Sequence, residues 1–493
     1  MKQPDILFFM SDQHTPCYSG FEGKNVDTPA MDTLCRDGTR FAQAYSTCPL
    51  CVPARLAMLS GLRPAKTGIF TLDDALPDMT PTFLHYLVEL GYETVLIGRM
   101  HFVGADQRHG FTKRIAGDMT HTSWNAPRKQ LEEDRGVHTR CFGEPCCTAV
   151  VGGGESPTQY YDSYVIDAAL NYLSEEHEKP QFIMVGLYGP HFPYVAPKDL
   201  YLKYRERVVL PASFYDPCPT PVLARHHQNV SEDLALGIQA AYCAMIEQLD
   251  SRLAKVRSAF DSYCERKGNG RLFLYTSDHG DQCGDRSMFA KSTFYEKSAK
   301  IPLILAGDGI EAGAVCNTPV SIMDIGPTLL EYVGAQPMLD VDGVSAAPAL
   351  RGLEIPEHPV YGEFLERESM QMPAHSYCFM IRSGNYKYMN FADDPDCELL
   401  FDVINDPEER INLAESSPEL LSAMRALAAK HAMPEQAVRL QDQHTRFNKL
   451  WKAYESACEG SFDVERWGNT PPQAREYPEI CLKNENLKML SKK

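Results

Sequence analysis

Four short apolar runs along the chain lack alternation of apolar and polar positions, as strands do when both faces of their sheet are covered. These runs are DILFFM (5–10), ETVLIG (93–98), QFIMVGLY (181–188) and RLFLYT (271–276). Stretches with helical spacing separate the runs, namely TFLHYLVELG (82–91), YYDSYVIDAALNYLSEE (160–176) and LALGIQAAYCAMIEQLDSRLAKVRSAF (234–260). The pattern predicts an α/β fold whose large, mostly parallel sheet carries helices on both faces.

Polar side chains follow each apolar run at the point where the predicted strand ends. They are Asp12 after the first run, Arg99 and His101 after the second, His191 after the third, and Asp278 and His279 after the fourth. In an open parallel sheet, ligands bind beyond the carboxyl ends of the strands. We therefore expect these groups to meet in one site at one edge of the sheet.

The pattern changes in the last third of the chain. We predict a catalytic α/β domain over residues 1–350 and a C-terminal α+β subdomain over 351–493. The subdomain is expected to hold a small antiparallel sheet and a helical tail, on the evidence of YKYMNF (386–391), ELLFDVINDPEE (398–409) and PELLSAMRALAAKHA (418–432). The weakly periodic stretch 112–157 is expected to form surface excursions near the mouth of the site.

Composition and charge narrow the class of protein. The chain has 493 residues, of which 44% are hydrophobic and 23% charged, as in ordinary globular proteins. Its net charge of -18 argues against broad binding to nucleic acids or anionic membranes, which need surplus Lys and Arg. An anionic substrate therefore needs a locally positive pocket.

The N-terminal segment and the cysteine content indicate the cellular compartment in which the protein is expected. The apolar run before Ser11 is too short for a signal peptide or a membrane span, so we expect a cytoplasmic protein. The 16 cysteines are scattered through a long chain, which predicts reduced thiols rather than a disulfide framework.

The segment TCPLCVPARLAMLSG (47–61) allows three interpretations. A redox C-x-x-C pair, Cys48 and Cys51, leaves Pro53 and Arg55 unexplained, and a zinc site lacks a second Cys or His pair at matching spacing. Pro53 fits the first turn of a helix that Gly61 ends. Cys51 would then lie at the helix N-terminus with Arg55 one turn later, which predicts an anion-binding nucleophile site.

Within this segment, CVPAR resembles the C-x-P-x-R signature of the type I, formylglycine-dependent sulfatases of the alkaline phosphatase superfamily. The similarity extends over 25–64, over PHFPYVAP (190–197), and over SDHGDQCGDRSMFAKSTFYEKSAKIPLIL (277–305). It runs in order over about residues 4–335, and 398–414 resembles the family's C-terminal subdomain.

The resemblance implies a maturation enzyme that converts Cys51 to formylglycine, whose hydrate is the nucleophile. It implies one divalent cation, Ca²⁺ first and Mn²⁺ or Mg²⁺ as alternatives. The implied metal ligands are Asp12, Gln13, the modified Cys51, Asp278 and His279. The other implied roles are Arg55 orienting the hydrate, Lys291 and Arg99 binding sulfate, His191 as general acid and His101 as base.

Two positions depart from the family pattern. Gln13 stands where most members have a second aspartate, which removes a formal charge from the metal site. Arg99 stands where most have lysine, so a role in proton transfer is in doubt there. The SDQ start and the Asp-His pair also resemble the choline sulfatases and the phosphonate monoester hydrolases.

Each candidate has an ordinary structural alternative. Asp12 alone fits a cap or turn, Arg99 a salt bridge at a strand end, and Lys291 a solvated surface lysine. His101 and His191 could equally be hydrogen-bonded structural histidines. Their convergence on strand ends favours the functional interpretation.

The predicted function is hydrolysis of a sulfate monoester of a small organic or sugar substrate. The first alternative is a phosphonate monoester or phosphodiester hydrolase that uses the same site. The second is a non-catalytic metal- or anion-binding or redox protein in which Cys51 stays unmodified. The expected partners are a small anionic sulfate ester and the maturation enzyme, with a homo-oligomer allowed.

Overall fold

The computed structural model describes residues 3–23, 26–119, 147–366, 376–458 and 479–482. Its central feature is an eight-stranded sheet in the order β12-β2-β11-β9-β1-β7-β4-β5. The four predicted strands are neighbours in the middle of this sheet and run parallel. They are β9 (Arg271–Ser277), β1 (Asp5–Asp12), β7 (Gln181–Pro190) and β4 (Glu93–Gly98).

The flanks of the sheet are less regular than its centre. On one side, β5 (Lys113–Ala116) runs parallel to β4. On the other side, β11 (Leu303–Gly307) is antiparallel to both β9 and β2 (Gly38–Phe41), and β12 (Ala314–Cys316) runs parallel to β2. A mostly parallel sheet is thus confirmed, with one reversed strand that the apolar pattern did not reveal.

The expectation of surface excursions over 112–157 is wrong at both ends of that stretch. Residues 113–116 form β5, and β6 (Val151–Gly153) pairs with β8 (Tyr194–Ala196) and β18 (Ile480–Leu482). Strands this short contain too few positions to show a period. Residues 120–146 lie outside the described residues.

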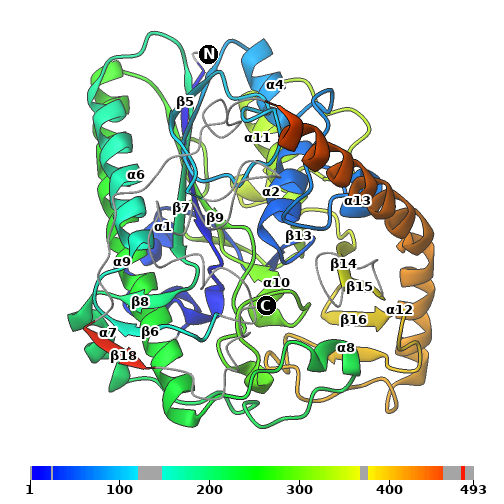
Figure 1. Cartoon of the computed structure of the whole chain (residues 1–493). Helices are drawn as coiled ribbons and strands as arrows, with labels where there is room; N and C mark the ends of the chain where they lie inside the picture. Colours follow the sequence, from blue (N-terminus) through cyan, green and yellow to red (C-terminus); the bar gives the residue numbers. More distant parts are fainter. Residues whose placement is uncertain (1–2, 24–25, 120–146, 367–375, 459–478, 483–493) are drawn as a thin grey trace.

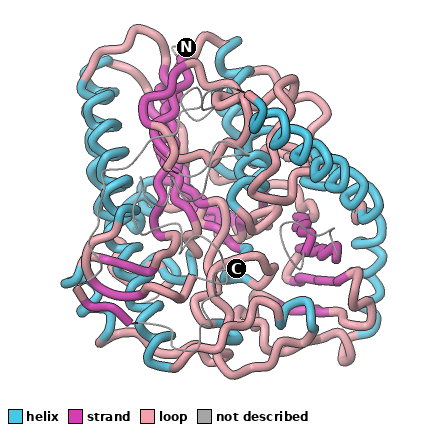
Figure 2. The backbone as a smooth tube through the Cα atoms, in the orientation of Figure 1, coloured by secondary structure: helices cyan, strands magenta, loops and turns pink. Residues whose placement is uncertain are grey.

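Helices cover both faces of the sheet, as expected (Figure 1). Along β1, Phe8 and its even-numbered neighbours pack with one set of helices, and Phe9 and its odd-numbered neighbour with the other. The first set is α2 (Cys51–Ser60), α4 (Phe83–Glu89) and α11 (Ile325–Val333), and the second is α1 (Pro29–Asp37), α6 (Pro157–Ser174) and α9 (Glu232–Lys267). Figure 2 shows the strands between these two layers.

Helix α2 has the boundaries that its sequence predicts. Cys51 is its first residue, Pro53 lies in its first turn, and Gly61 follows its end with φ 68°. A left-handed residue at this place lets the Gly61 N–H bond back to the Ala57 carbonyl at 2.8 Å. The whole helix is buried, so its N-terminus opens into the protein rather than into bulk water.

The C-terminal part contains the predicted antiparallel sheet and helical tail. Its four strands are β14 (Val360–Glu366), β15 (Ser376–Ser383), β16 (Tyr386–Phe391) and β17 (Leu399–Asp402), followed by α12 (Pro418–His431) and α13 (Pro434–Ala457). Buried ion pairs join it to the rest, including Arg63 to Glu363 at 2.5 Å and Lys387 to Glu296 at 2.8 Å. The boundary at residue 350 stays a prediction.

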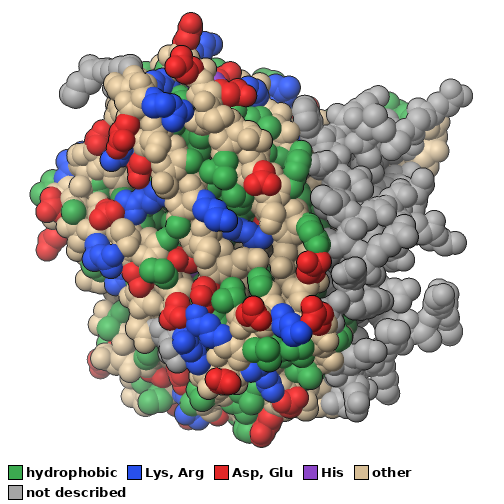
Figure 3. Space-filling model, turned by 90° about the vertical axis from the view of Figure 1, so that its left-hand side faces the viewer, with side chains coloured by type: hydrophobic (Ala, Val, Ile, Leu, Met, Phe, Trp, Pro, Cys, Tyr) green, Lys and Arg blue, Asp and Glu red, His purple; other side chains and the backbone are tan. Residues whose placement is uncertain are grey.

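Short elements complete the described fold. They are the sheet of β3 (Ala44–Tyr45), β10 (Lys300–Ile301) and β13 (Val320–Ser321), and the helices α3 (Pro64–Thr67), α7 (Lys198–Arg205), α8 (Pro221–Ala224) and α10 (Glu296–Ala299). Among the described helices, none has the length and apolar composition that spanning a membrane requires. Acidic and basic side chains are interspersed over the coloured part of the face in Figure 3, which carries no continuous basic surface.

The packing of β1 can be tested with Phe8→Ala. Phe8 is fully buried and meets the Phe182 ring edge-on, so the truncation should lower the free energy of unfolding by about 3–5 kcal/mol. Urea unfolding followed by circular dichroism measures the change. Leu339→Ala, at a side chain that is 76% exposed, is the control and should change it by less than about 0.5 kcal/mol. Equal effects of the two variants would contradict the assignment of β1 to the core.

Candidate active site

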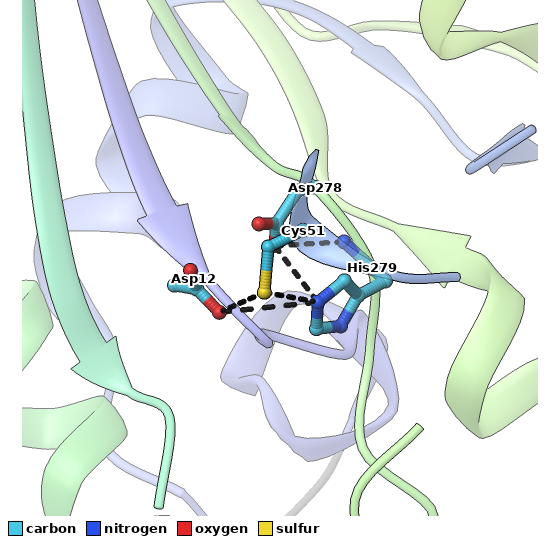
Figure 4. A group of neighbouring side chains, drawn as sticks. All are labelled: Asp12, Cys51, Asp278 and His279. Atoms are coloured by element: carbon cyan, nitrogen blue, oxygen red, sulfur yellow. Dashed lines mark hydrogen bonds and ion pairs between the residues drawn. The ribbon is translucent and has the colours of Figure 1, made fainter. Parts of the chain in front are cut away.

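Four side chains converge where the central strands end (Figure 4). Ser11 of β1 pairs with Ser277 of β9. Asp12, the last residue of β1, and Asp278, the residue after β9, therefore lie at the same level. Cys51 enters from the N-terminus of α2, and His279 follows Asp278. One ligand atom from each of Asp12, Cys51, Asp278 and His279 lies within 4.8 Å of all the others, and all four side chains are buried.

Arg55 joins the two carboxylates. Its Nε donates to Asp278 Oδ2 at 2.8 Å and its Nη2 to Asp12 Oδ2 at 3.1 Å. The Oδ1 atoms are left on the side of the cluster. Asp12 Oδ1 lies 3.6 Å from Cys51 Sγ, and Asp278 Oδ1 lies 3.6 Å from His279 Nε2. One turn of α2 separates Arg55 from Cys51, which is why a single helix supplies both the nucleophile position and this clamp.

Arg99 forms a second clamp, on the other side of Asp12. Its Nε donates to Asp12 Oδ2 at 2.7 Å, its Nη1 to Asp118 Oδ1 at 3.3 Å and its Nη2 to His101 Nδ1 at 2.9 Å. The guanidinium carbon lies 4.4 Å from the centre of the Tyr188 ring. The salt-bridge interpretation of Arg99 is confirmed, and any contact with sulfate would be additional to it.

Asp118 is a site residue that the sequence analysis missed. It follows β5, whose Ala116 pairs with Ile97 of β4, so the register brings Asp118 beside Arg99. Its Oδ2 accepts from the backbone N–H of His101 at 2.7 Å. A carboxylate two residues after an apolar pair was the available signal, but β5 is too short to be predicted.

Lys291 and His191 are the next pair of basic side chains beside Cys51. Lys291 Nζ lies 3.2 Å from Cys51 Sγ and 2.9 Å from His191 Nε2. The Nδ1 of His191 is 2.6 Å from the Phe192 carbonyl, which can only accept. Lys291 is 3% exposed, so the interpretation of a solvated surface lysine is wrong.

Gln13 lies beside the cluster with its amide held in place. Its Nε2 donates to Asp281 Oδ2 at 2.6 Å, and its Oε1 accepts from Lys291 Nζ at 3.1 Å. Asp281 Oδ2 also accepts from the Tyr194 hydroxyl at 2.7 Å. Asp281, whose role the sequence analysis did not anticipate, therefore turns the amide oxygen of Gln13 toward Lys291. Metal ligation by Gln13 stays a prediction.

The charges around the cluster set the states of its groups. Burial by itself raises the pKa of Asp12, but the positive charge of Arg99, reinforced by other nearby cationic groups, brings that pKa well below its usual range. Burial, followed by the charge of Asp12, raises the pKa of the Cys51 thiol to about 11. At neutral pH the site therefore holds ionised Asp12 beside an uncharged thiol.

The redox interpretation of Cys48 and Cys51 finds no support in the geometry. Both are free thiols in the described structure. Cys48 packs among apolar side chains of a separate buried cluster, and burial raises its pKa well above the usual range. Cys51 instead contacts Asp12, His279 and Lys291. The two cysteines have different surroundings and do not form a working pair.

Comparison with known proteins agrees with this geometry. The profile of the sulfatase family matches residues 4–335, and that of the N-sulphoglucosamine sulphohydrolase C-terminal region matches 284–433. The choline-sulfatase of Rhizobium meliloti (strain 1021) is 31% identical over 506 aligned residues, covering 96% of this chain and 94% of the relative.

Two solved structures share the fold. One is a protein in complex with its substrate D-glucosamine-2-N,6-O-disulfate, with TM-score 0.71, 20% identity, and coverage of 88% of this chain and 98% of that one. The other is the phosphonate monoester hydrolase of Silicibacter pomeroyi, with TM-score 0.70, 20% identity, and coverage of 87% and 95%. With the family profile matched over its whole α/β part, the chain belongs to the sulfatase family of the alkaline phosphatase superfamily and is a sulfuric ester hydrolase.

Proposed function

We propose that this enzyme hydrolyses the sulfate monoester of a small organic substrate with a formylglycine made from Cys51 and one bound divalent cation. The observation that carries the proposal is the cluster itself. Cys51 is the first residue of α2 and lies within 4.8 Å of carboxylate and imidazole donors from two strand ends. A nucleophile and a cation can therefore meet the same ester group.

The residues present fit an oxidised Cys51 better than a thiol. Sulfur is a soft donor and a poor ligand for a hard cation such as Ca²⁺, which prefers oxygen. Formylglycine supplies a hydrated aldehyde, with one oxygen for the cation and one hydroxyl to attack sulfur. Conversion by a maturation enzyme would thus match the oxygen-rich surroundings of position 51.

The donor set also fits a divalent cation. The arginines bond to Oδ2 of Asp12, and its Oδ1 faces Cys51. Oδ1 of Asp278 lies 3.6 Å from His279 Nε2 and also accepts from the backbone N–H groups of Gln13 and His279 at 3.0 Å each. His279 Nδ1 lies 3.0 Å from the Gly280 carbonyl, which leaves the Nε2 lone pair for a metal. Carboxylate oxygens accommodate Ca²⁺, Mn²⁺ and Mg²⁺, and an imidazole ligand also suits transition metals. We propose Ca²⁺ first, with Mn²⁺ and Mg²⁺ as alternatives.

A cation would make the site positive. Without it, the carboxylates of Asp12, Asp118 and Asp278 balance three basic side chains, those of Arg55, Arg99 and Lys291. The substrate anion would therefore be attracted mainly by the charge that the cation adds. This local effect allows a chain of net charge -18 to bind an anion.

The pair of Lys291 and His191 is the proposed source of the proton for the leaving alcohol. Lys291 donates to His191 Nε2 at 2.9 Å, and Lys291 Nζ also lies 3.2 Å from position 51. A proton shared between these nitrogens lies next to the place where an alkoxide would leave. The hydrogen on His191 Nδ1 is already donated to the Phe192 carbonyl. His191 can therefore protonate the leaving alcohol only through Nε2, after Nε2 has taken a proton from Lys291.

Choline sulfate is the first substrate that we propose. The support is the 31% identity to a choline-sulfatase over nearly the full length of both chains, including the C-terminal part. Sugar sulfates and aryl sulfates are the alternatives. A phosphonate monoester or phosphodiester is the second candidate, because Gln13 after Asp12 and His279 after Asp278 form a pattern that resembles both choline sulfatases and phosphonate monoester hydrolases.

Conversion of Cys51 is tested by mass spectrometry of the peptide across this residue, from protein produced with a formylglycine-generating enzyme. We expect an aldehyde at position 51, and Cys51→Ala should lower kcat/KM at least about a thousandfold. Cys48→Ala is the control and should retain turnover. An unmodified thiol in protein that turns over sulfate esters, or an active Cys51→Ala variant, would refute the proposed nucleophile.

The cation site is tested with Asp278→Asn. The amide keeps an oxygen but loses the charge, so the affinity for Ca²⁺ in isothermal titration calorimetry should fall at least about tenfold, or 1.4 kcal/mol. Asp340→Asn is a matched control at an exposed residue with φ 55°, a conformation that asparagine tolerates. Unchanged affinity in Asp278→Asn would remove this residue from the ligand set.

Substrate class is tested by comparing kcat/KM of the matured enzyme for choline sulfate, an aryl sulfate and an aryl phosphonate monoester. We expect the highest value for a sulfate ester, with choline sulfate above the aryl sulfate. Faster turnover of the phosphonate together with a requirement for Mn²⁺ would favour the second candidate instead.

A further inference from the structure

Three histidines border the site, and their neighbours determine which ring nitrogen carries the proton. In His279, Nδ1 lies 3.0 Å from the Gly280 carbonyl, and in His191 it lies 2.6 Å from the Phe192 carbonyl. A carbonyl oxygen only accepts hydrogen bonds, so Nδ1 carries the hydrogen in both neutral rings. Both therefore present a lone pair at Nε2.

His101 is the opposite case. Its Nδ1 lies 2.9 Å from Nη2 of Arg99, and a guanidinium has only donors and does not lose its proton in proteins. The Nδ1 of His101 must therefore accept. The hydrogen of the neutral ring then stands on Nε2, and His101 presents a donor where the other two present an acceptor.

Several contacts fix the positions of Arg99 and His101 relative to each other. Asp118 accepts from Arg99 Nη1 at 3.3 Å and from the backbone N–H of His101 at 2.7 Å. Arg99 is also tied to Asp12 at 2.7 Å and covered by the ring of Tyr188. A lysine at position 99, as most of the family has, would offer one nitrogen instead of a planar fork and could not make these three bonds in the same geometry.

The Nε2 of His101 is open to a ligand. Among the residues that the structure describes, none hydrogen-bonds to it. It is also absent from the buried polar atoms that lack a partner, in contrast to His109 Nε2, so it reaches solvent. Burial, followed by the charge of Arg99, lowers the pKa of His101 well below its usual range, which keeps the ring neutral at pH 7. A neutral ring with one open N–H is therefore bonded to the same guanidinium as Asp12.

We infer that His101 acts as a hydrogen-bond donor to the ester through Nε2–H, with Arg99 and Asp118 as the positioning residues that hold its tautomer. This role rests on the proposed function. It replaces the expected role of a base, because an Nε2 that already carries hydrogen has no lone pair for a proton. Arg99 thus acts on the substrate through His101, and its planar fork lets one side chain bond Asp12, Asp118 and His101 together.

The tautomer is tested without activity, by ¹⁵N NMR of histidine-labelled protein near pH 7. The His101 signals are assigned by their loss in His101→Gln. We expect Nε2 at the chemical shift of a protonated ring nitrogen and Nδ1 at that of a lone-pair nitrogen. In Asp118→Asn the loosened Arg99 should let the second tautomer appear. A lone pair on Nε2 in the wild type would overturn the inference, and an unchanged spectrum of Asp118→Asn would remove Asp118 from it.

The donor role is tested by substitution in the matured enzyme. The amide nitrogen of glutamine can take the place of Nε2, whereas that of asparagine takes the place of Nδ1. His101→Gln should keep kcat/KM within about fivefold of the wild type, and His101→Asn and His101→Ala should lose about 10- to 100-fold, the value of one hydrogen bond to a charged group. His109→Gln, at a buried histidine paired with Asp106 outside the cluster, is the control for the exchange itself.

A general base predicts a different outcome. If His101 removes a proton, His101→Gln should be as impaired as His101→Ala, by about 100-fold or more, and that result would overturn the inference. Failure of the proposed function is a separate result. If the matured wild type hydrolyses none of the three esters, the function fails, while the NMR experiment still decides which nitrogen of His101 carries the hydrogen.

Discussion

The site depends on one buried interaction, the bridge that Arg55 makes between Asp12 and Asp278. Two carboxylates at the ends of adjacent strands repel each other, and all three side chains have no exposure to solvent. The guanidinium of Arg55 pairs with both, while Arg99 adds a second positive charge beside Asp12 and backbone N–H groups bond to Asp278. The same bridge aligns β1, β9 and α2, and it turns one oxygen of each carboxylate toward Cys51 and His279. The positions of the nucleophile and the metal donors therefore follow from one arginine.

The balance of charge explains how an acidic protein handles an anion. Asp12, Asp118 and Asp278 pair with Arg55 and Arg99, Lys291 lies beside Cys51, and Asp281 lies beside Gln13, so the protein alone offers little net attraction. A divalent cation held by the cluster would supply that attraction at the point where the ester must bind. Affinity for the substrate and occupancy by metal are then coupled through electrostatics, and a protein without metal or without conversion of Cys51 should be inert for different reasons.

The hydrogen-bond partner of each site histidine determines which ring nitrogen carries the hydrogen, and so what that histidine can do. Backbone carbonyls beside His191 and His279 place a lone pair on the side of the site, where one receives a hydrogen bond from Lys291 and the other can bind a cation. Arg99 instead donates to Nδ1 of His101, which places the hydrogen of that ring on Nε2. The side chain at position 99 therefore sets which nitrogen of its neighbour His101 carries the hydrogen.

The central strands, the helices on both faces, and the convergence of Asp12, Cys51, Asp278 and His279 could all be predicted from the apolar runs and the motifs, because apolar runs record burial and motif residues follow strand ends. It did not reveal the reversed β11, the short β5 or the partners Asp118 and Asp281. Those depend on strand register and on contacts between residues far apart in the chain, such as Gln13 and Asp281. That Arg99 bonds to carboxylates and to a ring nitrogen at once follows from long-range packing, since a local pattern specifies which side chains are buried but not which atoms they meet.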